Sequence, residues 1–245
     1  MIVPIVLHRV VKSELNSFED ISIQSLNRIL MKDSGQFITM KNVDDIKIKS
    51  NKRYYLLTFD DGNLSDFNIV FPLLQELKIK ATFFINPKTV GNKNFMNWAM
   101  VEEMSEYGMC IGSHSYSHHN MQKLKIRDAK KEFDESKEII SKKINQKVDF
   151  FAFPYGKYNN TLVQLAISCG YDKCFVSKHG VISSGNLIIP RNSINGSMSF
   201  YQIDKVLECS IYTRVKWIFL DSIKSILKNT LGEKIYIHLR KIALQ

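Results

Sequence analysis

One apolar run in this sequence ends abruptly in two carboxylates and a glycine: YYLLTFDDG, Tyr54–Gly62. Six uncharged residues in a row are typical of a strand that is buried on both faces. The adjacent carboxylates of Asp60 and Asp61 repel each other, which raises the pKa of one of them unless a cation is present. The stretch therefore predicts a buried strand that ends either in an exposed turn or in a site combining metal binding with proton transfer.

Similar short apolar runs recur on both sides of this stretch, and segments with helical spacing lie between them. The predicted strands are Ile2–Leu7, Ala81–Ile85, Cys110–Ile111, Asp149–Phe153, Cys174–Val176 and Leu187–Ile189. The predicted helices are Ile21–Met31, Phe67–Leu77, Trp98–Glu106, Lys125–Ile144 and Thr161–Ser168. Because strands and helices alternate across most of the chain, the sequence indicates an α/β fold built from parallel βαβ units.

The length and charge of the chain suggest one large domain followed by a basic tail. The chain has 245 residues and a formal net charge of +10, and an α/β barrel commonly takes about 250 residues as one domain. We expect that domain to cover 1–203, including the N-terminal strand, and an amphipathic helical tail to cover 204–245. The basic residues of the tail include Arg214, Lys216, Lys224, Lys228, Lys234, Arg240 and Lys241.

Two interpretations of the tail stay open. Its basic and apolar residues fit peripheral contact with an anionic membrane, and they equally fit a packing helix with a solvated Lys/Arg face. Nucleic acid is not an expected partner, because the basic residues are dispersed and no aromatic stacking platform accompanies them.

A second polar motif, HSYSH at His114–His118, follows the predicted strand that opens at Cys110. Two histidines four residues apart can present two imidazole nitrogens to one metal ion. His119 directly follows the motif and could replace His118 through a shift of one residue. Together with one carboxylate of the Asp pair, two histidines make a three-ligand set that leaves a position for water, as catalytic zinc sites do.

Most of the polar residues of interest follow a predicted strand. In barrels of parallel strands, the C-terminal ends of the strands build the active site. If the fold prediction holds, four separate regions of the sequence therefore meet on one face. They contribute Asp60 and Asp61, His114, Pro154 and Tyr155, and Arg191.

These motifs resemble those of the polysaccharide deacetylases, the NodB-homology proteins of carbohydrate esterase family 4. The matching stretches occur in the family's order: TFDDG at Thr58–Gly62, PLLQELKIKATFFI at Pro72–Ile85, IGSHSYSH at Ile111–His118, FAFPYGKYN at Phe151–Asn159 and CGYDKCF at Cys169–Phe175. The third motif, FAFPYG, is most similar to the branch that deacetylates poly-N-acetylglucosamine. The resemblance covers the chain from Met1 to Ile194.

The resemblance implies a distorted (β/α) barrel of parallel strands, the NodB-homology fold. It also implies a hydrolase that acts on a carbon–nitrogen bond and removes the acetyl group of an N-acetylated sugar, in a glycan or a lipid-linked glycan precursor. Two alternatives stay open. One is an O-acetyl esterase acting on a carbohydrate, and the other is a weakly active, glycan-binding relative in a glycan-assembly complex.

The resemblance also assigns roles to the motif residues. Asp61, His114 and His118 would hold one divalent ion, which is usually zinc in the family. Co²⁺, Ni²⁺ and Mn²⁺ are alternatives, because two histidines and one aspartate accept several divalent ions. Asp60 would be the general base that takes a proton from the attacking water.

The remaining roles rest on the third motif and on two departures from the family pattern. The backbone N–H of Tyr155, following Pro154, would help to hold the oxyanion. Ala152 stands where many relatives have an arginine, so Arg191 is the candidate that keeps Asp60 ionised; a solvated loop arginine is the alternative. Many relatives also carry a general-acid histidine in a late strand that ends in Leu-x-His, and the sequence after Ile189 has no such motif. His8, in an early Leu-His-x-Val motif, is therefore the candidate general acid, and a capping or core histidine is the alternative.

The N-terminal residues, MIVPIVLHRVV, have no basic segment ahead of the apolar run, which is interrupted by Pro4 and ended by His8. Signal peptides and membrane spans are longer than this run. We therefore expect a cytoplasmic protein, with peripheral contact at the inner face of the membrane through the tail. Because a cytoplasmic enzyme meets precursors rather than finished polymers, the expected substrate is an acetylated carbohydrate precursor.

Overall fold

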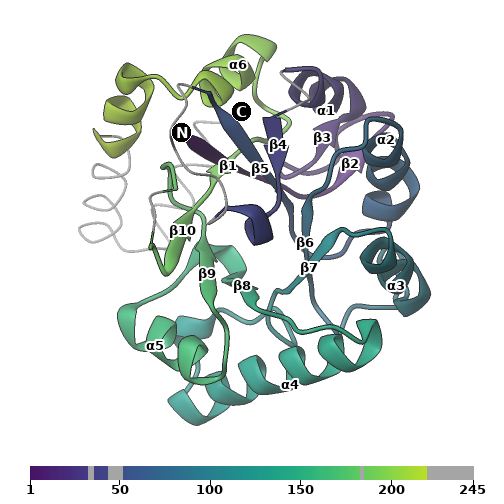
Figure 1. The fold of residues 1–245 in the computed structure, drawn as a ribbon, viewed down its shortest axis with the longest axis vertical. Helices are drawn as coiled ribbons and strands as arrows, with labels where there is room; N and C mark the ends of the chain where they lie inside the picture. Colours follow the sequence, from purple (N-terminus) through teal and green to yellow (C-terminus); the bar gives the residue numbers. More distant parts are fainter. Residues whose placement is uncertain (33–35, 44–51, 183–184, 220–245) are drawn as a thin grey trace. The chain divides into compact units, whose positions relative to one another are not determined.

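The computed structural model describes residues 1–32, 36–43, 52–182 and 185–219 (Figure 1). The chain divides into two compact units, Met1–Leu207 and Glu208–Gln245. The predicted boundary between 203 and 204 falls inside helix α6 (Phe200–Glu208), a few residues before this division.

The centre of the first unit is a sheet in which every paired strand is parallel. Its strand order is β10-β9-β8-β7-β6-β5-β1-β11, with β4 pairing beside β5. The strands are β1 (Ile2–Leu7), β4 (Phe37–Ile38), β5 (Tyr54–Phe59), β6 (Thr82–Ile85), β7 (Cys110–Ser113), β8 (Phe150–Ala152), β9 (Lys173–Val176), β10 (Ile188–Pro190) and β11 (Asn192–Ser193).

The two ends of this strand order are neighbours in the chain. Only Arg191 separates β10 from β11, and β11 pairs with β1 at Ile5↔Asn192. The sheet therefore curls into a nearly closed barrel, visible end-on in Figure 1. This confirms the predicted distorted barrel of parallel strands.

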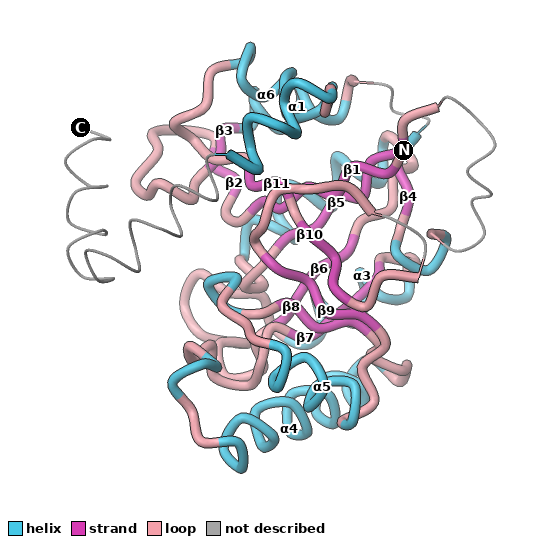
Figure 2. Tube along the Cα trace, turned by 90° about the vertical axis from the view of Figure 1, so that its left-hand side faces the viewer, coloured by secondary structure: helices cyan, strands magenta, loops and turns pink. Residues whose placement is uncertain are grey.

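Helices surround the sheet, with α1 and α6 at one end and α4 and α5 at the other (Figures 1 and 2). Side-chain oxygens of Ser22, Asn97 and Asn159 cap the first turns of α1, α3 and α5, which satisfies backbone N–H groups that have no partner within the helix. The helices are α1 (Ile23–Leu30), α2 (Phe71–Glu76), α3 (Trp98–Glu106), α4 (Ile126–Ile144), α5 (Asn160–Ser168) and α6.

Alternate strand residues fill the barrel interior, as expected where buried side chains point inward from every second position. The interior cluster draws on seven strands. Its members on strands are Ile2, Leu56, Phe84, Cys110, Phe150, Ala152, Phe175 and Ile189.

The predicted helix Phe67–Leu77 is divided in the structure. A π-helical turn covers Asp66–Val70, and α2 begins at Phe71 with Pro72 in its first turn. Proline is well accommodated there, because the first N–H groups of a helix have no acceptor within it. The helix predicted at Ile21–Met31 begins later, because Ile21–Ser22 forms strand β3 and pairs with β2 (Val10–Val11).

In the second unit, the described part includes a helical segment at 211–219. No helix among the residues that the structure describes has both the length and the apolarity needed to cross a membrane. The predicted tail residues Lys224, Lys228, Lys234, Arg240 and Lys241 lie outside the described residues.

Candidate active site

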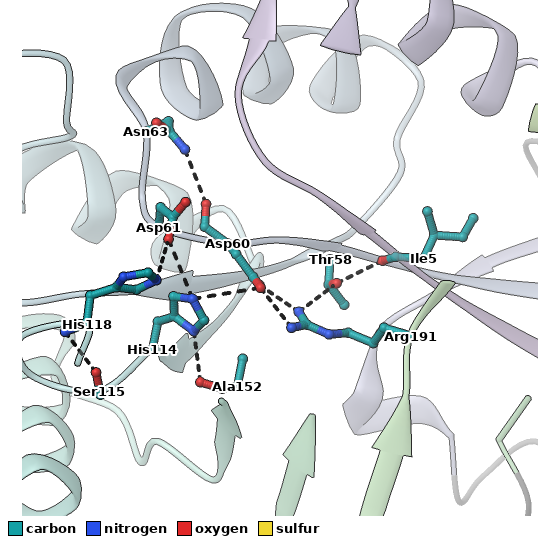
Figure 3. Close-up of polar contacts among 10 residues, drawn as sticks. All are labelled: Ile5, Thr58, Asp60, Asp61, Asn63, His114, Ser115, His118, Ala152 and Arg191. Carbon is teal, nitrogen blue, oxygen red and sulfur yellow. Dashed lines mark hydrogen bonds and ion pairs between the residues drawn. The ribbon is translucent and has the colours of Figure 1, made fainter. Parts of the chain in front are cut away.

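Strand register brings the predicted site residues to one end of the barrel. Leu7 of β1 pairs with Phe59 of β5, and the N–H of Asp60 donates to the Leu7 carbonyl at 3.1 Å. The N–H of His114 donates to the carbonyl of Ile85, the last residue of β6, at 2.8 Å. The residues that follow β1, β5 and β7 are therefore neighbours in space, as Figure 3 shows for Asp60, Asp61 and His114.

Three of these side chains converge as a metal site would require. Asp61 Oδ1 lies 3.5 Å from His114 Nε2 and 3.3 Å from His118 Nε2 (Figure 3). Two ligands that share a tetrahedral ion at about 2.0–2.2 Å lie roughly 3.4 Å apart. The spacing of Asp61, His114 and His118, with all their ligand atoms within 4.8 Å of one another, therefore fits one divalent ion.

The protonation of His114 also suits a metal ligand. Its Nδ1 lies 2.8 Å from the carbonyl oxygen of Ala152, so the proton is assigned to Nδ1 and Nε2 keeps its lone pair toward Asp61. Burial lowers the pKa of His114, and the neighbouring carboxylates of Asp60 and Asp61 only partly oppose that effect. A neutral imidazole is the form that binds metals.

The loop after β7 decides which second histidine faces Asp61. Ser115 and His118 both have positive φ, 63° and 59°, and Ser115 Oγ accepts a hydrogen bond from the His118 N–H at 3.0 Å. His119 is mostly exposed, and its Nδ1 lies 3.6 Å from Glu132 on α4. The structure thus places His118, and not His119, against Asp61.

Asp60 lies on the inner side of this group, paired with Arg191. Two guanidinium nitrogens donate to its two carboxylate oxygens at 2.6 and 2.7 Å, and Thr58 Oγ1 accepts from the same guanidinium at 3.2 Å (Figure 3). Arg191 is 1% exposed, and its guanidinium lies over the rings of Phe84 and Phe175 at 5.3 and 5.8 Å. The alternative of a solvated loop arginine is therefore wrong.

The charge of Asp60 follows from this pairing. Burial by itself raises its pKa, but the positive charge of Arg191, together with His114 and the hydrogen bonds, outweighs burial and brings the pKa below its usual value. Asp60 is consequently a carboxylate that can accept a proton in a water-poor setting. His114 Nε2 is 3.9 Å from Asp60 Oδ2, so this carboxylate adjoins the predicted metal position.

Tyr155 lies beside the outer histidine. Its ring centroid is 4.8 Å from that of His118, its side chain is 63% exposed, and its φ of 59° is left-handed. The turn from Pro154 to Gly156 is tightly packed, because a Cβ on Gly156 would lie 2.5 Å from the Ser177 side chain. The turn therefore has a fixed position beside the Asp61 group.

His8 follows β1 and is half-buried, so it is not a core histidine. One ligand atom each of His8, Glu19 and Asp61 lies within 4.8 Å of the others. No sequence motif marks Glu19, which lies in a polar loop.

Asp66 is a second residue near the site that no sequence pattern marks. It is fully buried, and among the described residues neither carboxyl oxygen has a hydrogen-bond partner. Burial, reinforced by the charges of Asp61 and Asp60, holds its pKa well above the usual value. No local pattern distinguishes it from a solvated helix residue.

Comparison with known proteins finds similarity to polysaccharide deacetylases. Residues 47–174 match a family model described as polysaccharide deacetylase. The poly-β-1,6-N-acetyl-D-glucosamine N-deacetylase of Staphylococcus aureus (strain MRSA252) is 27% identical over 175 residues, covering 64% of this chain and 60% of that protein. YxkH of Bacillus subtilis (strain 168), whose own polysaccharide deacetylase assignment is provisional, is 27% identical over 153 residues.

The YxkH match covers 62% of this chain and 55% of that protein, so the chain spans little more than half of either curated relative. Among solved structures, IcaB from Ammonifex degensii superimposes with a TM-score of 0.73 at 25% identity. The superposition covers 84% of this chain and 97% of that one. The shared architecture therefore includes the barrel and its strand ends.

Proposed function

Because this chain belongs to the polysaccharide deacetylase family, we propose that it hydrolyses the acetyl group of an acetylated carbohydrate, and specifically the acetamido group of an N-acetylated sugar. One observation carries the proposal. The ligand atoms of Asp61, His114 and His118 converge within 4.8 Å, directly beside an Asp60 carboxylate that is paired with Arg191. A metal site and an ionised base next to each other are what metal-assisted hydrolysis requires.

Asp61, His114 and His118 would hold one divalent ion, with Zn²⁺ as the proposed metal and Co²⁺, Ni²⁺ or Mn²⁺ as alternatives. When bound, such an ion lowers the pKa of water and polarises the acetyl carbonyl. The donor set supports this assignment, because His114 presents a neutral Nε2 and Asp61 a carboxylate whose pKa lies below its usual value.

Asp60 accepts the proton of the attacking water as the new carbon–oxygen bond forms. Arg191 keeps Asp60 ionised and fixes the direction of its oxygens through the bidentate pairing. The N–H of Tyr155 would donate to the oxygen that gains negative charge, an interaction that is strongest in the transition state.

His8 would give a proton to the departing nitrogen as the carbon–nitrogen bond breaks, releasing acetate and an amino sugar. An amine is a poor leaving group unless it is protonated, whereas an ester needs this help less. A histidine whose ligand atom lies within 4.8 Å of Asp61 therefore favours N-deacetylation over the O-acetyl esterase alternative.

The substrate class that we propose is an N-acetylated glycan or its lipid-linked precursor. Its support is the similarity to the S. aureus poly-β-1,6-N-acetyl-D-glucosamine N-deacetylase, at 27% identity. Released acetate, measured with N-acetylglucosamine oligomers and with lipid-linked acetamido sugars, tests the reaction and ranks the two substrate forms.

Asp60→Asn tests the mechanism. We expect turnover to fall by about 10²- to 10⁴-fold, the usual contribution of a positioned acid or base, while bound zinc stays at one equivalent. Asp172→Asn is the matched control, because it removes an exposed carboxylate away from the site and should leave turnover unchanged. Full activity in Asp60→Asn would remove this residue from the role of base, and no acetate release by the unaltered protein would reject deacetylation.

We also propose that the second unit contacts an anionic membrane at its cytoplasmic face, which would bring the barrel to a lipid-linked substrate. The helical segment 211–219 exposes large apolar side chains at a spacing that forms one stripe, with Arg214 and Lys216 in the same segment. The exposed apolar residues are Ile211, Tyr212, Val215, Ile218 and Phe219.

Vesicle sedimentation tests this contact. The full chain should sediment with vesicles of acidic lipid and not with neutral ones, and the Ile211→Asn/Val215→Asn variant should sediment less. Equal sedimentation of the unaltered chain and the variant would contradict the membrane proposal.

A further inference from the structure

A second group of potential metal ligands adjoins the first. His8 after β1, Glu19 in the loop between β2 and β3, and Asp61 after β5 each offer one ligand atom, and these atoms lie within 4.8 Å of one another. The two groups share Asp61. We propose that His8, Glu19 and Asp61 form a second divalent-cation site, bridged to the first by the Asp61 carboxylate, and that its occupancy inhibits the enzyme.

The Glu19 loop is held in place by the residue that follows Glu19. Asp20 is 1% exposed and accepts hydrogen bonds from the Arg9 guanidinium at 2.7 and 2.6 Å. It also accepts from the N–H groups of Asn16 and Ser17 at 2.8 and 2.9 Å. Because Arg9, Asn16 and Ser17 all bond to this one buried carboxylate, the backbone that carries Glu19 is held beside the site.

The loop is also packed from the other side. A Cβ at Gly196 would lie 2.5 Å from the Asp20 carbonyl oxygen and 2.5 Å from the Leu15 side chain, so this approach requires glycine. Glu19 N–H donates to Ser17 Oγ at 3.3 Å. The carboxylate of Glu19 therefore belongs to an ordered element, although its side chain is exposed to ions from solution.

Asp61 belongs to both groups, so its carboxylate is the ligand that the two sites would share. One oxygen, Oδ1, contacts both His114 Nε2 and His118 Nε2, while the other oxygen points away from the two imidazoles (Figure 3). A carboxylate with two outward-facing oxygens can bind one ion with each, and paired ions in hydrolases lie about 3.5–4 Å apart. One histidine and two carboxylates are an ordinary donor set for Zn²⁺ or Mn²⁺.

Occupancy of the second site has a direct chemical consequence. A metal-bound imidazole nitrogen has no proton to give, so an ion on His8 removes the group that would protonate the departing nitrogen. The site would bind more weakly than the first, because Glu19 is exposed and only one histidine contributes. Excess divalent metal should therefore inhibit at concentrations above those that fill the first site. This effect on turnover rests on the proposed function, whereas the binding itself does not.

Equilibrium dialysis against Zn²⁺ alone, with zinc counted by mass spectrometry, measures the two sites without any substrate. The unaltered protein should bind two equivalents, the second more weakly. Glu19→Gln should keep the tight equivalent and lose the weak one. Glu14→Gln is the matched control, because it removes an exposed carboxylate from the same loop and should keep both.

A second measurement compares acetate release at one equivalent and at excess Zn²⁺. The rate of acetate release at excess Zn²⁺, divided by the rate at one equivalent, should be well below one for the unaltered protein and for Glu14→Gln. It should stay near one for Glu19→Gln. One equivalent bound by all three proteins would overturn the second site while the proposed function stands. Two equivalents in Glu19→Gln would also overturn it, because the weak ion then binds elsewhere. No zinc in any of the three would reject the first site, and with it the proposed function.

Discussion

The inner and outer halves of the site are built in different ways. The inner half is Asp60, His114 and Arg191; the outer half is Asp61, His118 and Tyr155. Inner side chains are at most 3% exposed, whereas the outer ones are 25%, 28% and 63% exposed. All three outer residues have left-handed backbone, with φ of 77°, 59° and 59°.

The two halves should contribute differently to the stability of the fold and to ligand binding. The inner half is held by strand register and by hydrogen bonds within the barrel, so its side chains cannot be removed without leaving buried polar groups unpaired. The outer half sits in loops whose strained backbone persists because the surrounding structure holds it, a pattern typical of functional sites. We expect inner substitutions to lower the free energy of unfolding and outer ones to act mainly on ligand binding.

The largest expected effect is that of Arg191→Met. The substitution leaves the buried Asp60 carboxylate without its partner, and breaking a buried ion pair in this way costs about 3–5 kcal/mol of unfolding free energy. The pKa of Asp60 should rise, so the activity that remains should require higher pH. Urea unfolding and the pH profile of acetate release measure the two effects.

The double variant Asp60→Asn/Arg191→Met is the control for that experiment. Removing the charge together with its partner should restore part of the lost stability without restoring turnover. A double variant as unstable as Arg191→Met alone would show that the arginine stabilises the barrel through its packing on Phe84 and Phe175 and not through the ion pair.

Asp66→Asn should have a smaller effect than Arg191→Met, and it should raise the free energy of unfolding at high pH instead of lowering it. Because the folded state holds the pKa of Asp66 above its usual value, protonation favours folding, and that contribution is lost as pH rises from about 4 through the raised pKa. At pH 8 the variant should be more stable than the unaltered protein by on the order of 1 kcal/mol, and near pH 4 the two should be equal.

Thermal unfolding at several pH values measures this difference. A chelator is present so that no metal ion neutralises the charge of Asp61. Asp172→Asn, at an exposed position, should show no such pH dependence. A gain for Asp66→Asn that is the same at every pH would contradict the titration of Asp66.

The smallest expected effect is that of Tyr155→Phe. In the proposed reaction the backbone N–H of Tyr155 acts, and its side chain is 63% exposed, so loss of the hydroxyl should change neither kcat/KM nor the melting temperature. A large fall in kcat/KM would show that the hydroxyl itself contacts the substrate.

Local pattern was sufficient for the long elements, and it singled out Asp61, His114 and His118, whose ligand atoms lie within 4.8 Å of one another. Tyr54–Phe59 and Trp98–Glu106 coincide with β5 and α3, because uncharged runs and helical spacing are properties of neighbouring residues. The choice between His118 and His119 was open, since it depends on the left-handed backbone at Ser115 and His118 and on Glu132, which draws His119 away.

The features that could not be predicted from the sequence depend on contacts between distant segments of the chain. Strand β11 has two residues and no periodicity, and exists because it lies against β1. Glu19 lies near Asp61 in a loop that Asp20 anchors to Arg9, a contact between residues eleven positions apart. The burial of Asp66 depends on the π-helical turn, which no spacing rule indicates.

The position of Arg191 between β10 and β11 has a consequence for synthesis of the chain. A nascent polypeptide that has emerged through β9 already carries Asp60, Asp61 and both histidines, but it lacks the guanidinium that pairs with Asp60. Closure of the barrel against β1 delivers that guanidinium to Asp60 in the same step. The proposed metal ligands are therefore present early on the ribosome, while the proposed base gains its partner only with the last strand.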